Sequence, residues 1–551
     1  MSVPSNSTVL VVGGGPAGSY AACVLAREGV DVVVLEADVF PRYHIGESML
    51  ASMRYFLRFI ELEEEFDKHG FEKKYGATFK ITDKKPAFTD FSVSLGQGGY
   101  SWNVIRSESD EMIFRYAEKC GAKVFDGTKV DEITFEPYNQ DGFDRKIRLA
   151  NPGRPVSAKW SRKDGTNGSI SFDYIIDASG RNGIISTKYL ENRRLNEALK
   201  NIANWTYWKG AKRFNPGEKN ENSPFFEALS DGSGWVWAIP LHNGTLSCGI
   251  VARQDIFFAK KKETGLSGAE FYKEYLKMAP QIHDMISGAE MLSDVKQASD
   301  WSYSAGAYAG PHFRLAGDAG CFIDPYFSSG VHLALTSGLS AAATIQASIR
   351  GQCSELTAAK WHTTKVNEGY TRFLLVVMTV LRELRAKGAA IIAGSKDEGY
   401  DKAFSFIQPV IQGTADTQVE NTSIQKKAAE GVEFALGTMK KDRKAEERAI
   451  LDKVQGARDH AEEMEKLTEE ELATLSAIVH RNIRLTNNEK NLNNIANDVI
   501  DGLSIDLVRG NLGLVKKFND DIKMQTGKDS CINSEQMDAL ELNHTVTVQA
   551  S

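Results

Sequence analysis

The chain has 551 residues and a net charge of −7, and 25% of its residues are charged and 42% hydrophobic. These values are ordinary for a globular protein, and the length allows two or three domains. A slightly acidic chain is a poor candidate for binding nucleic acid, because neutralising phosphates requires a basic surface. The six cysteines lie far apart without a CxxC pair, which argues against a zinc or other metal site and favours reduced thiols. We therefore expect a cytoplasmic enzyme.

The sequence predicts neither a secretory signal nor a membrane span. The first eight residues carry no basic group, which a secretory signal requires. The most hydrophobic later stretch, residues 373–381, is followed by Arg382 and Arg385 and is shorter than the roughly 20 residues that a bilayer requires. It predicts a buried helix.

A nucleotide-binding unit is predicted at the N-terminus. The β-branched run 8–12 predicts a strand, and the glycine-rich loop 13–18 follows it directly. A helical pattern then extends from about Pro16 to Gly29, and a second buried strand ends at the acidic Glu36. In this order of elements, a GxGxxG loop binds the pyrophosphate of a dinucleotide at the start of the helix.

Each glycine of such a loop has a physical role. Gly13 permits the tight turn, Gly15 lets the backbone approach the pyrophosphate, and Gly18 allows the helix to pack closely on the strand. Glu36 can accept hydrogen bonds from a ribose diol. We expect Gly13, Gly15, Ala17, Gly18 and Glu36 to contact the nucleotide.

Two later segments indicate that the nucleotide is FAD. Residues 173–181 predict a buried strand that ends in an Asp-Ala-Ser-Gly turn, and residues 313–320 predict another that leads to Gly317-Asp318. Together with the N-terminal loop, they resemble the FAD-dependent aromatic hydroxylases and their relatives. The resemblance implies that Asp318 binds the ribityl and phosphate region of FAD. A helix N-cap is the ordinary alternative for this residue.

Two further motifs resemble those of the flavin-dependent halogenases. Residues 235–240 spell WxWxIP, and residues 322–330 fit FxxPxxSxG. Trp235 and Trp237 would share one face of a strand, where ordinary sheet packing is the alternative. The resemblance implies that these tryptophans and Pro325 keep the substrate away from the flavin. It also implies that backbone N–H groups of Ser329 and Gly330 bind chloride, whereas the alternative is a serine N-cap.

The family resemblance also implies a catalytic lysine remote from the flavin. Its short Gly-Phe-x-x-Lys-x-Gly stretch corresponds to residues 70–76, which places the lysine at Lys74. Lys73 and Lys80 are near competitors, and a solvated surface lysine is the ordinary alternative. A PRxxIGES turn at 41–48 supports the resemblance. It adds Arg42 and Ile45, together with Arg106, as residues that contact FAD, although either arginine could belong to a surface ion pair.

The resemblance implies an α/β fold with a Rossmann-like FAD-binding domain of the aromatic hydroxylase type, an inserted antiparallel β-sheet for the substrate and a C-terminal α-helical extension. We expect the FAD-binding domain at 1–75, 104–195 and 305–350. The sheet is expected at 76–103 and 196–304, and the helical extension at 351–551, where the pattern remains helical.

The activity implied is that of a halogenase that uses reduced FAD, O2 and chloride to make hypochlorous acid. Lys74 would relay the chlorine to a phenolic substrate, such as a free polyketide-type natural product. A separate reductase would supply the reduced FAD by diffusion. One alternative is an FAD-dependent phenol monooxygenase that uses NADPH, and another is a catalytically silent FAD-binding scaffold.

Overall fold

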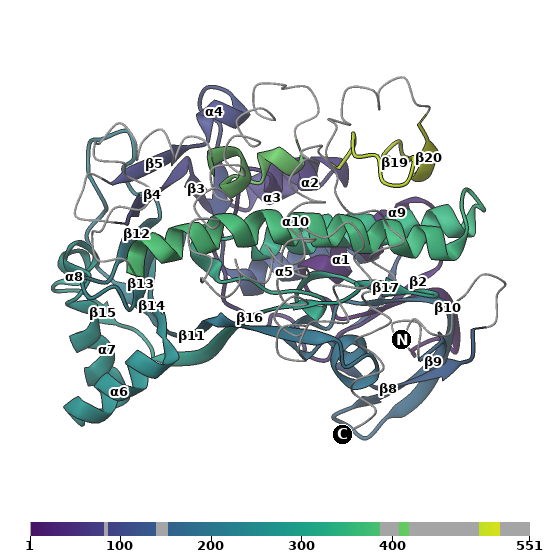
Figure 1. The fold of residues 1–551 in the computed structure, drawn as a ribbon, viewed down its shortest axis with the longest axis horizontal. Coiled ribbons are helices and arrows are strands. Elements are labelled where there is room, and N and C mark those ends of the chain that lie inside the picture. The colour runs from purple at the N-terminus through teal and green to yellow at the C-terminus, as the bar shows by residue number, and fades with distance from the viewer. Residues whose placement is uncertain (1, 82–85, 139–151, 386–406, 418–494, 518–551) are drawn as a thin grey trace, which may run out of the picture.

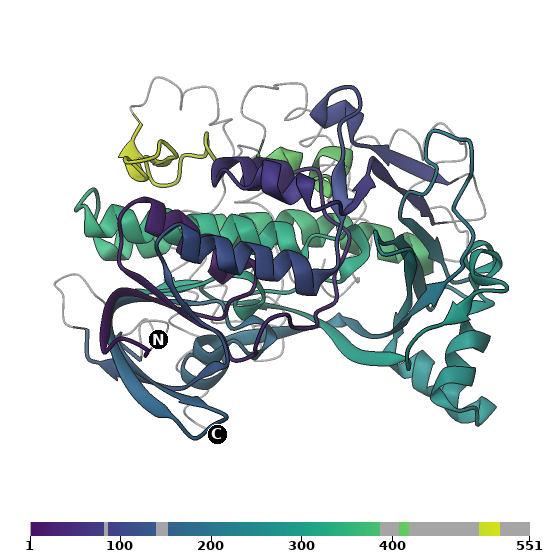
Figure 2. The ribbon, with the colours of Figure 1, turned by 180° about the vertical axis from the view of Figure 1, so that it is seen from behind.

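The structure is a computed structural model that describes residues 2–81, 86–138, 152–385, 407–417 and 495–517. Two eight-stranded sheets lie toward opposite ends of the long axis, and the helix α10 (Glu355–Arg385) spans much of the distance between them (Figure 1). The view from behind shows the same arrangement (Figure 2).

The first sheet contains the predicted nucleotide-binding unit. Strand β1 (Asn6–Val12) leads into helix α1 (Pro16–Arg27), which ends before Gly29 at a φ of +80°. β1 pairs in parallel with both β2 and β10. The strand order is β17 (Ala309–Gly310), β18 (Phe313–Leu315), β10 (Asn167–Asp177), β1, β2 (Val32–Leu35) and β7 (Lys123–Phe125). The strands and the helix that the sequence predicted here are confirmed.

An antiparallel extension completes this sheet, and one helix covers α1. Strands β8 (Thr128–Glu136) and β9 (Arg154–Arg162) pair with each other, and β9 pairs with β10. Helix α5 (Arg106–Lys119) packs against α1. The N-terminus of α5 therefore lies near the glycine-rich loop.

The second sheet is largely antiparallel, as expected for the substrate half. Its long strand β11 pairs with β14, β15 and β16. One pair is parallel, between β12 and β4, and β5 lies beyond β4 at the edge of the sheet. The strands are β4 (Gly76–Lys80), β5 (Ala87–Asp90), β11 (Arg193–Lys209), β12 (Phe225–Ala228), β13 (Gly234–Pro240), β14 (Thr245–Arg253), β15 (Glu290–Met291) and β16 (Lys296–Ala305). How the elements divide into domains stays a prediction.

Short helices surround the two sheets. The second sheet packs one face against α6 (Gln254–Thr264), α7 (Gly268–Leu276) and α8 (Pro280–Ile286), and the hydrophobic residues of β13 on that face are Val236 and Ala238. Helices α2 (Met53–Phe59) and α3 (Glu63–Lys68) contact each other, and α4 (Ser92–Leu95) directly follows β5 of the second sheet. The small strand β3 (Glu72–Lys74) pairs with β6 (Ser101–Asn103).

Two long helices form the centre of the molecule. Helix α9 (Gly330–Ile349) packs against α1 and α10, and most of its residues are buried. The stretch 373–381 lies within α10, where Phe373, Val376 and Val377 are buried, so the predicted buried helix is confirmed. Within the described ranges, no helix combines the length and hydrophobicity needed to cross a membrane.

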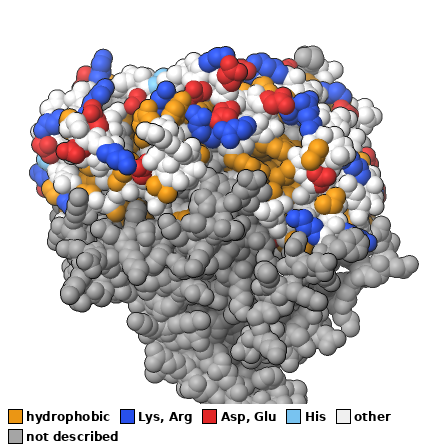
Figure 3. All heavy atoms as spheres, turned by 90° about the horizontal axis from the view of Figure 1, so that it is seen from above, with side chains coloured by type: hydrophobic (Ala, Val, Ile, Leu, Met, Phe, Trp, Pro, Cys, Tyr) orange, Lys and Arg blue, Asp and Glu red, His pale blue; other side chains and the backbone are white. Residues whose placement is uncertain are grey.

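The C-terminal part is not helical throughout, contrary to the sequence pattern. Strands β19 (Leu503–Asp506) and β20 (Gly513–Lys516) form a hairpin. Trp361 of α10 donates its Nε1–H to the Leu503 carbonyl at 3.1 Å, and Leu503, Ile505, Leu512 and Leu514 are buried. Tertiary packing on α9 and α10 thus stabilises a hairpin that local patterning does not predict. Seen from above, the described surface intermingles basic and acidic side chains around exposed hydrophobic ones (Figure 3).

Candidate active site

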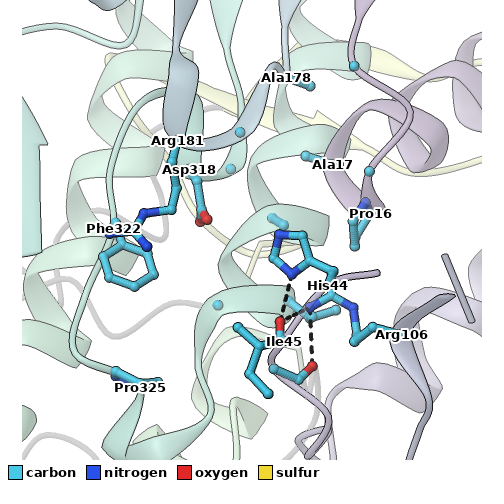
Figure 4. Close-up of a pocket in the computed structure, with 18 of the residues that line it drawn as sticks. Pro16, Ala17, His44, Ile45, Arg106, Ala178, Arg181, Asp318, Phe322 and Pro325 are labelled. Atoms are coloured by element: carbon cyan, nitrogen blue, oxygen red, sulfur yellow. Dashed lines mark hydrogen bonds between the residues drawn. The ribbon is translucent and has the colours of Figure 1, made fainter. Parts of the chain in front are cut away.

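A cavity of about 570 Å³ lies between the nucleotide-binding loops and the second sheet. Asp318, Arg181 and Phe322 project from one side, and His44, Ile45 and Arg106 lie opposite them (Figure 4). Of the predicted site residues, the wall includes Gly13, Gly15, Ala17, Glu36, Arg42, Ile45, Arg106, Trp235, Trp237, Asp318, Pro325 and Gly330. Gly18, Lys74 and Ser329 are not among the residues that line the cavity. The fold therefore brings together segments that are hundreds of residues apart.

The glycine-rich loop has the close backbone contacts that require glycine. Gly13 has a φ of +103°, and a Cβ on it would lie 2.2 Å from the Ala178 carbonyl oxygen. A Cβ on Gly18 would lie 2.0 Å from the Gly13 oxygen, so helix and strand could not pack as they do. Gly15 faces the cavity, where only the Arg42 guanidinium approaches its missing Cβ, at 3.3 Å. The loop thus leaves space in front of the α1 N-terminus, where backbone N–H groups favour an anion.

Glu36 directly follows β2, beside this loop. Its Oε2 accepts the Gly14 N–H at 2.6 Å, and its Oε1 accepts the Asp38 N–H at 2.9 Å. These bonds fix the carboxylate at the cavity wall, and its remaining lone pairs are available to hydroxyl donors.

Arg42 and Arg106 share one buried carboxylate, that of Asp110. Arg106 donates Nε to Oδ1 at 2.8 Å and Nη2 to Oδ2 at 3.0 Å, and Arg42 donates Nη1 to Oδ2 at 3.2 Å. Arg106 also donates to the backbone oxygens of Ile45 and Gly46 at 2.8 and 3.1 Å. The alternative of surface ion pairs is wrong for both arginines, because they line the cavity and Asp110 is buried.

Asp318 lies in the short 3-10 helix Gly317–Ala319, which follows β18. Its side chain caps no helix, since the N-cap position is Ala316 and no side-chain cap bond is made. Burial raises the pKa of Asp318, and the positive charges of Arg181, Arg106 and Arg193 act in the opposite direction. The carboxyl group faces the cavity and is free to contact a ligand there.

Trp235 and Trp237 share one face of β13, as their spacing predicts, and both are buried in the cavity wall. Their ring centroids are 5.9 Å apart. Trp237 donates its Nε1–H to Ser247 Oγ at 3.1 Å, whereas the Trp235 Nε1–H is buried without a partner. The two rings separate the nucleotide side of the cavity from the sheet behind it.

The loop before α9 contains Ser329 and Gly330. Ser329 is the N-cap residue but makes no side-chain cap bond, and its Oγ is buried without a partner. Ser329 thus occupies the N-cap position that the alternative predicts, but its side chain does not form the hydrogen bond of a cap. A Cβ on Gly330 would meet nothing within 4 Å, and Gly330 lines the cavity. The start of this long helix, whose first N–H groups have no partner within the helix, therefore borders open space.

Lys74 ends β3 and is only 2% exposed. Its Nζ donates to Ser48 Oγ and to the Met49 carbonyl, each at 2.8 Å, and lies 5.0 Å from the Phe91 ring centroid. Burial lowers the pKa of Lys74 to about 7, and no carboxylate among the described residues forms an ion pair with it. Ser48 itself lines the cavity.

The two competing lysines lie in different environments. Lys73 is exposed, and its Nζ lies 4.5 Å from the Tyr100 ring centroid. Lys80 pairs with Glu227 at 3.0 Å. Neither lines the cavity or contacts Ser48 through a described bond.

Comparison with known proteins identifies the family. A model of the FAD binding domain family matches residues 6–365. Flavin-dependent halogenase ptaM of Pestalotiopsis fici is 68% identical over 518 residues, which cover 94% of this chain and 96% of that protein. Sulochrin halogenase gedL of Aspergillus terreus is 62% identical over 550 residues, 99% of this chain and 98% of that protein. The chain belongs to the flavin-dependent halogenases.

Solved structures of halogenases have the same fold. The myxobacterial chondrochloren halogenase CndH has a TM-score of 0.61 and 25% identity over 77% of this chain and 93% of that chain. The flavin-dependent halogenase CmlS has a TM-score of 0.61 and 28% identity over 78% of each chain. This halogenase is thus an FAD-dependent oxidoreductase, which excludes the silent scaffold and disfavours the phenol monooxygenase.

FAD is the cofactor of this halogenase, and the cavity fits it. The positions of Gly13 and Gly18 exclude side chains that would push the loop into the phosphate site, and Gly15 leaves that site open. Glu36, with its fixed carboxylate, lies beside it. The same cavity is also lined by Asp318 and by the two tryptophans.

Sequence analysis did not single out Glu47, which also lines the cavity of the halogenase. Its Oε1 accepts the Tyr207 hydroxyl at 2.8 Å, and the Tyr43 hydroxyl lies 3.0 Å from that of Tyr207. Burial raises the pKa of Glu47 to about 7, and hydrogen bonds from Ser247 and Tyr207 oppose the shift. The sequence feature that could have identified Glu47 is its position in the PRxxIGES turn, directly before Ser48.

A buried polar network connects Ser52, which lies shortly after the Lys74 partners Ser48 and Met49 in the chain, to the C-terminal segment 407–417. Ser52 Oγ lies 2.8 Å from His332 Nδ1, and His332 Nε2 lies 2.9 Å from Asp416 Oδ2. Asp416 also pairs with Arg372 of α10. All four side chains are buried, so the network positions the chain around Met49 and Ser52. No signal within the sequence links these four positions.

One group of potential metal ligands lies away from the cavity. His69 Nε2 and His242 Nε2 lie 2.8 and 3.2 Å from the same oxygen of Glu108. Hydrogen bonds account for this arrangement without an ion. The expectation that no metal takes part stays a prediction.

Proposed function

We propose that this halogenase chlorinates a small phenolic molecule at a site beside Lys74. When bound in its reduced form, FAD supplies the electrons with which O2 and chloride are converted into hypochlorous acid and water. The chain itself binds the halide, separates the substrate from the flavin and transfers the chlorine. The observation that carries this proposal is the 2.8 Å hydrogen bond between Lys74 and Ser48 of the cavity wall.

The halide site is proposed at the start of α9. Backbone N–H groups of Ser329 and Gly330 bind chloride there, assisted by the positive end of the helix dipole. The Ser329 Oγ has no hydrogen-bond partner, so its hydroxyl is proposed as an additional donor to the ion. Pro325 and the two tryptophans form the wall that keeps an aromatic substrate from the flavin side.

Lys74 is proposed as the group that carries the chlorine. Its neutral amine attacks the chlorine of hypochlorous acid, forming an N–Cl bond and releasing the oxygen, with a proton, as water. The chlorine then passes to an electron-rich ring carbon, and the ring proton is lost. A lowered pKa supports this role because the amine is then partly neutral near pH 7.

The substrate and the source of reduced FAD are also proposals. The name of the Aspergillus terreus relative states that it halogenates sulochrin, and its 62% identity supports a small molecule of that kind. A separate reductase would supply reduced FAD by diffusion, as the family resemblance implies.

Mass spectrometry of the products tests the proposal. The enzyme would be incubated with a flavin reductase, FAD, NADH, chloride and a panel of phenols, and chlorine isotope pairs are expected. Lys74→Ala is expected to abolish chlorination while flavin oxidation continues, and Lys73→Ala should leave the product yield unchanged. Chlorination that survives Lys74→Ala, or hydroxylated products formed with NADPH alone, would contradict it.

A further inference from the structure

Two cysteines that are distant in sequence lie side by side between α1 and α5. Cys23 is at the end of the second turn of α1, and Cys120 is the C-cap residue of α5. Their Sγ atoms are 3.1 Å apart, although 97 positions separate them in the chain. Cys23 is fully buried and Cys120 is half-buried, so one sulfur is open to small solutes and the other is protected.

The surroundings of the pair favour a thiolate at Cys120. The hydrogen bond from Cys23 lowers the pKa of Cys120 to about 7, burial opposes the shift, and the Arg27 guanidinium lowers it further. The same hydrogen bond raises the pKa of Cys23, and burial adds to the increase. From the unequal burial and these shifts together, we expect the proton on Cys23 and the thiolate on Cys120.

We propose that Cys23 and Cys120 are a redox-active dithiol, which forms a reversible disulfide when the halogenase meets a peroxide or a hypohalous acid. In the first step the Cys120 thiolate attacks one oxygen of hydrogen peroxide, giving a sulfenic acid and, after protonation, water. In the second step the Cys23 sulfur attacks the sulfenic sulfur, forming the S–S bond and releasing the second water. The thiols lose two electrons and two protons, and the peroxide is reduced.

This modification would cross-link two helices whose other ends reach the FAD cavity. The N-terminus of α1 follows the glycine-rich loop, and the N-terminus of α5 carries Arg106. Neither cysteine lines the cavity, so we expect the oxidised protein to retain FAD binding. Lys74 has no part in the reaction, because hydrogen peroxide suffices as the oxidant.

Cys353 provides a matched control within the described chain. It is half-buried like Cys120, but burial raises its pKa. The other described cysteines, Cys248 and Cys321, are buried and their pKa values are raised. At pH 7 the thiolate fraction should therefore be much larger at Cys120 than at Cys353.

Peptide mapping of the full-length protein without reductant tests the proposal. After reduction, removal of the reductant and brief treatment with hydrogen peroxide, a peptide pair joined through Cys23 and Cys120 is expected. Dithiothreitol should reverse the link, and Cys353→Ser should still form it. Oxidation of Cys120 to a sulfinic acid without any link to Cys23, or no reaction at either residue, would overturn the proposal.

The rate of alkylation gives a second readout that does not depend on disulfide formation. At pH 7 iodoacetamide should modify Cys120 at least about tenfold faster than Cys353. In Cys23→Ala, Cys120 loses its hydrogen-bond donor, so its alkylation at pH 7 should slow. Equal rates at Cys120 and Cys353 in the unmodified chain would also overturn the proposal.

Discussion

Lys74 Nζ lies 2.8 Å from Ser48 Oγ. Ser48 lines the cavity, whereas Lys74 does not. A single side chain therefore separates the amine from the space in which FAD binds. The second partner of Lys74, the Met49 carbonyl, follows Ser48 directly in the chain. The PRxxIGES turn thus fixes the position of the lysine as well as one wall of the cavity.

Ser48→Ala should lower the yield of chlorinated product for each reduced flavin consumed by about tenfold. A hydrogen bond to a charged or strongly polar group contributes roughly 1.5–3 kcal/mol, and its loss leaves the Lys74 amine with only the Met49 carbonyl. The ratio of product to oxidised flavin measures the effect. Ser48→Thr, which keeps the hydroxyl, should retain most of the yield. An unchanged ratio in Ser48→Ala would show that this contact has no role in the transfer.

Much of the nucleotide-binding half could be predicted because its determinants are local. The strand, the glycine loop and the helix up to Gly29 follow one another in the chain, and each residue type is required by backbone geometry. The shared face of Trp235 and Trp237 follows from the period of a strand. Local patterning is sufficient for such features.

Contacts between distant segments could not be predicted in the same way. The pairing of β12 with β4 and the contact between Cys23 and Cys120 depend on how helices and sheets pack. The family motif predicted a catalytic role for Lys74, but its partners Ser48 and Met49 follow from tertiary structure alone. The hairpin β19–β20 was missed for the same reason, since helix α10 supplies its packing surface.

The burial of Lys74 should make the stability of the protein depend on pH. Its pKa is about 7 in the folded chain and 10.5 when solvated. Between these values the unfolded chain holds a proton that the folded chain lacks, so folding stability rises with pH in this window. Lys74→Met removes the dependence, so its gain in thermal midpoint over the wild type should be largest below pH 7 and shrink toward pH 10.

Thermal midpoints measured from pH 6 to pH 10 test this expectation. Lys73→Met is the control, because Lys73 is exposed and its replacement should give a difference that varies little with pH. A Lys74→Met difference that is constant across the range would mean that the amine has the same pKa in the folded and unfolded chains.

The two cavity tryptophans should differ in their tolerance of phenylalanine. Trp237→Phe removes the donor to Ser247 Oγ and leaves a buried hydroxyl with one partner fewer. Trp235→Phe removes an N–H that has no partner, so it loses ring volume alone. We expect Trp237→Phe to lower the free energy of unfolding by about 1 kcal/mol more than Trp235→Phe, as measured by denaturant titration. Equal losses would contradict the assigned hydrogen bond.

Asp110→Asn should weaken FAD binding by about tenfold or more, because one carboxylate orients both Arg42 and Arg106 at the cavity wall. Asparagine has the same shape, but it leaves the buried Arg106 guanidinium without its ion-pair partner and leaves Arg42 with only Glu36, whose Oε1 lies 4.0 Å away. Uncompensated buried charges are costly. Quenching of FAD fluorescence gives the dissociation constant, and circular dichroism verifies that the variant is folded. Glu111→Gln is the matched control on the same helix, since its pair with Arg115 is partly exposed and contributes little. A folded Asp110→Asn variant that binds FAD as tightly as the wild type would show that the arginines hold their positions without Asp110.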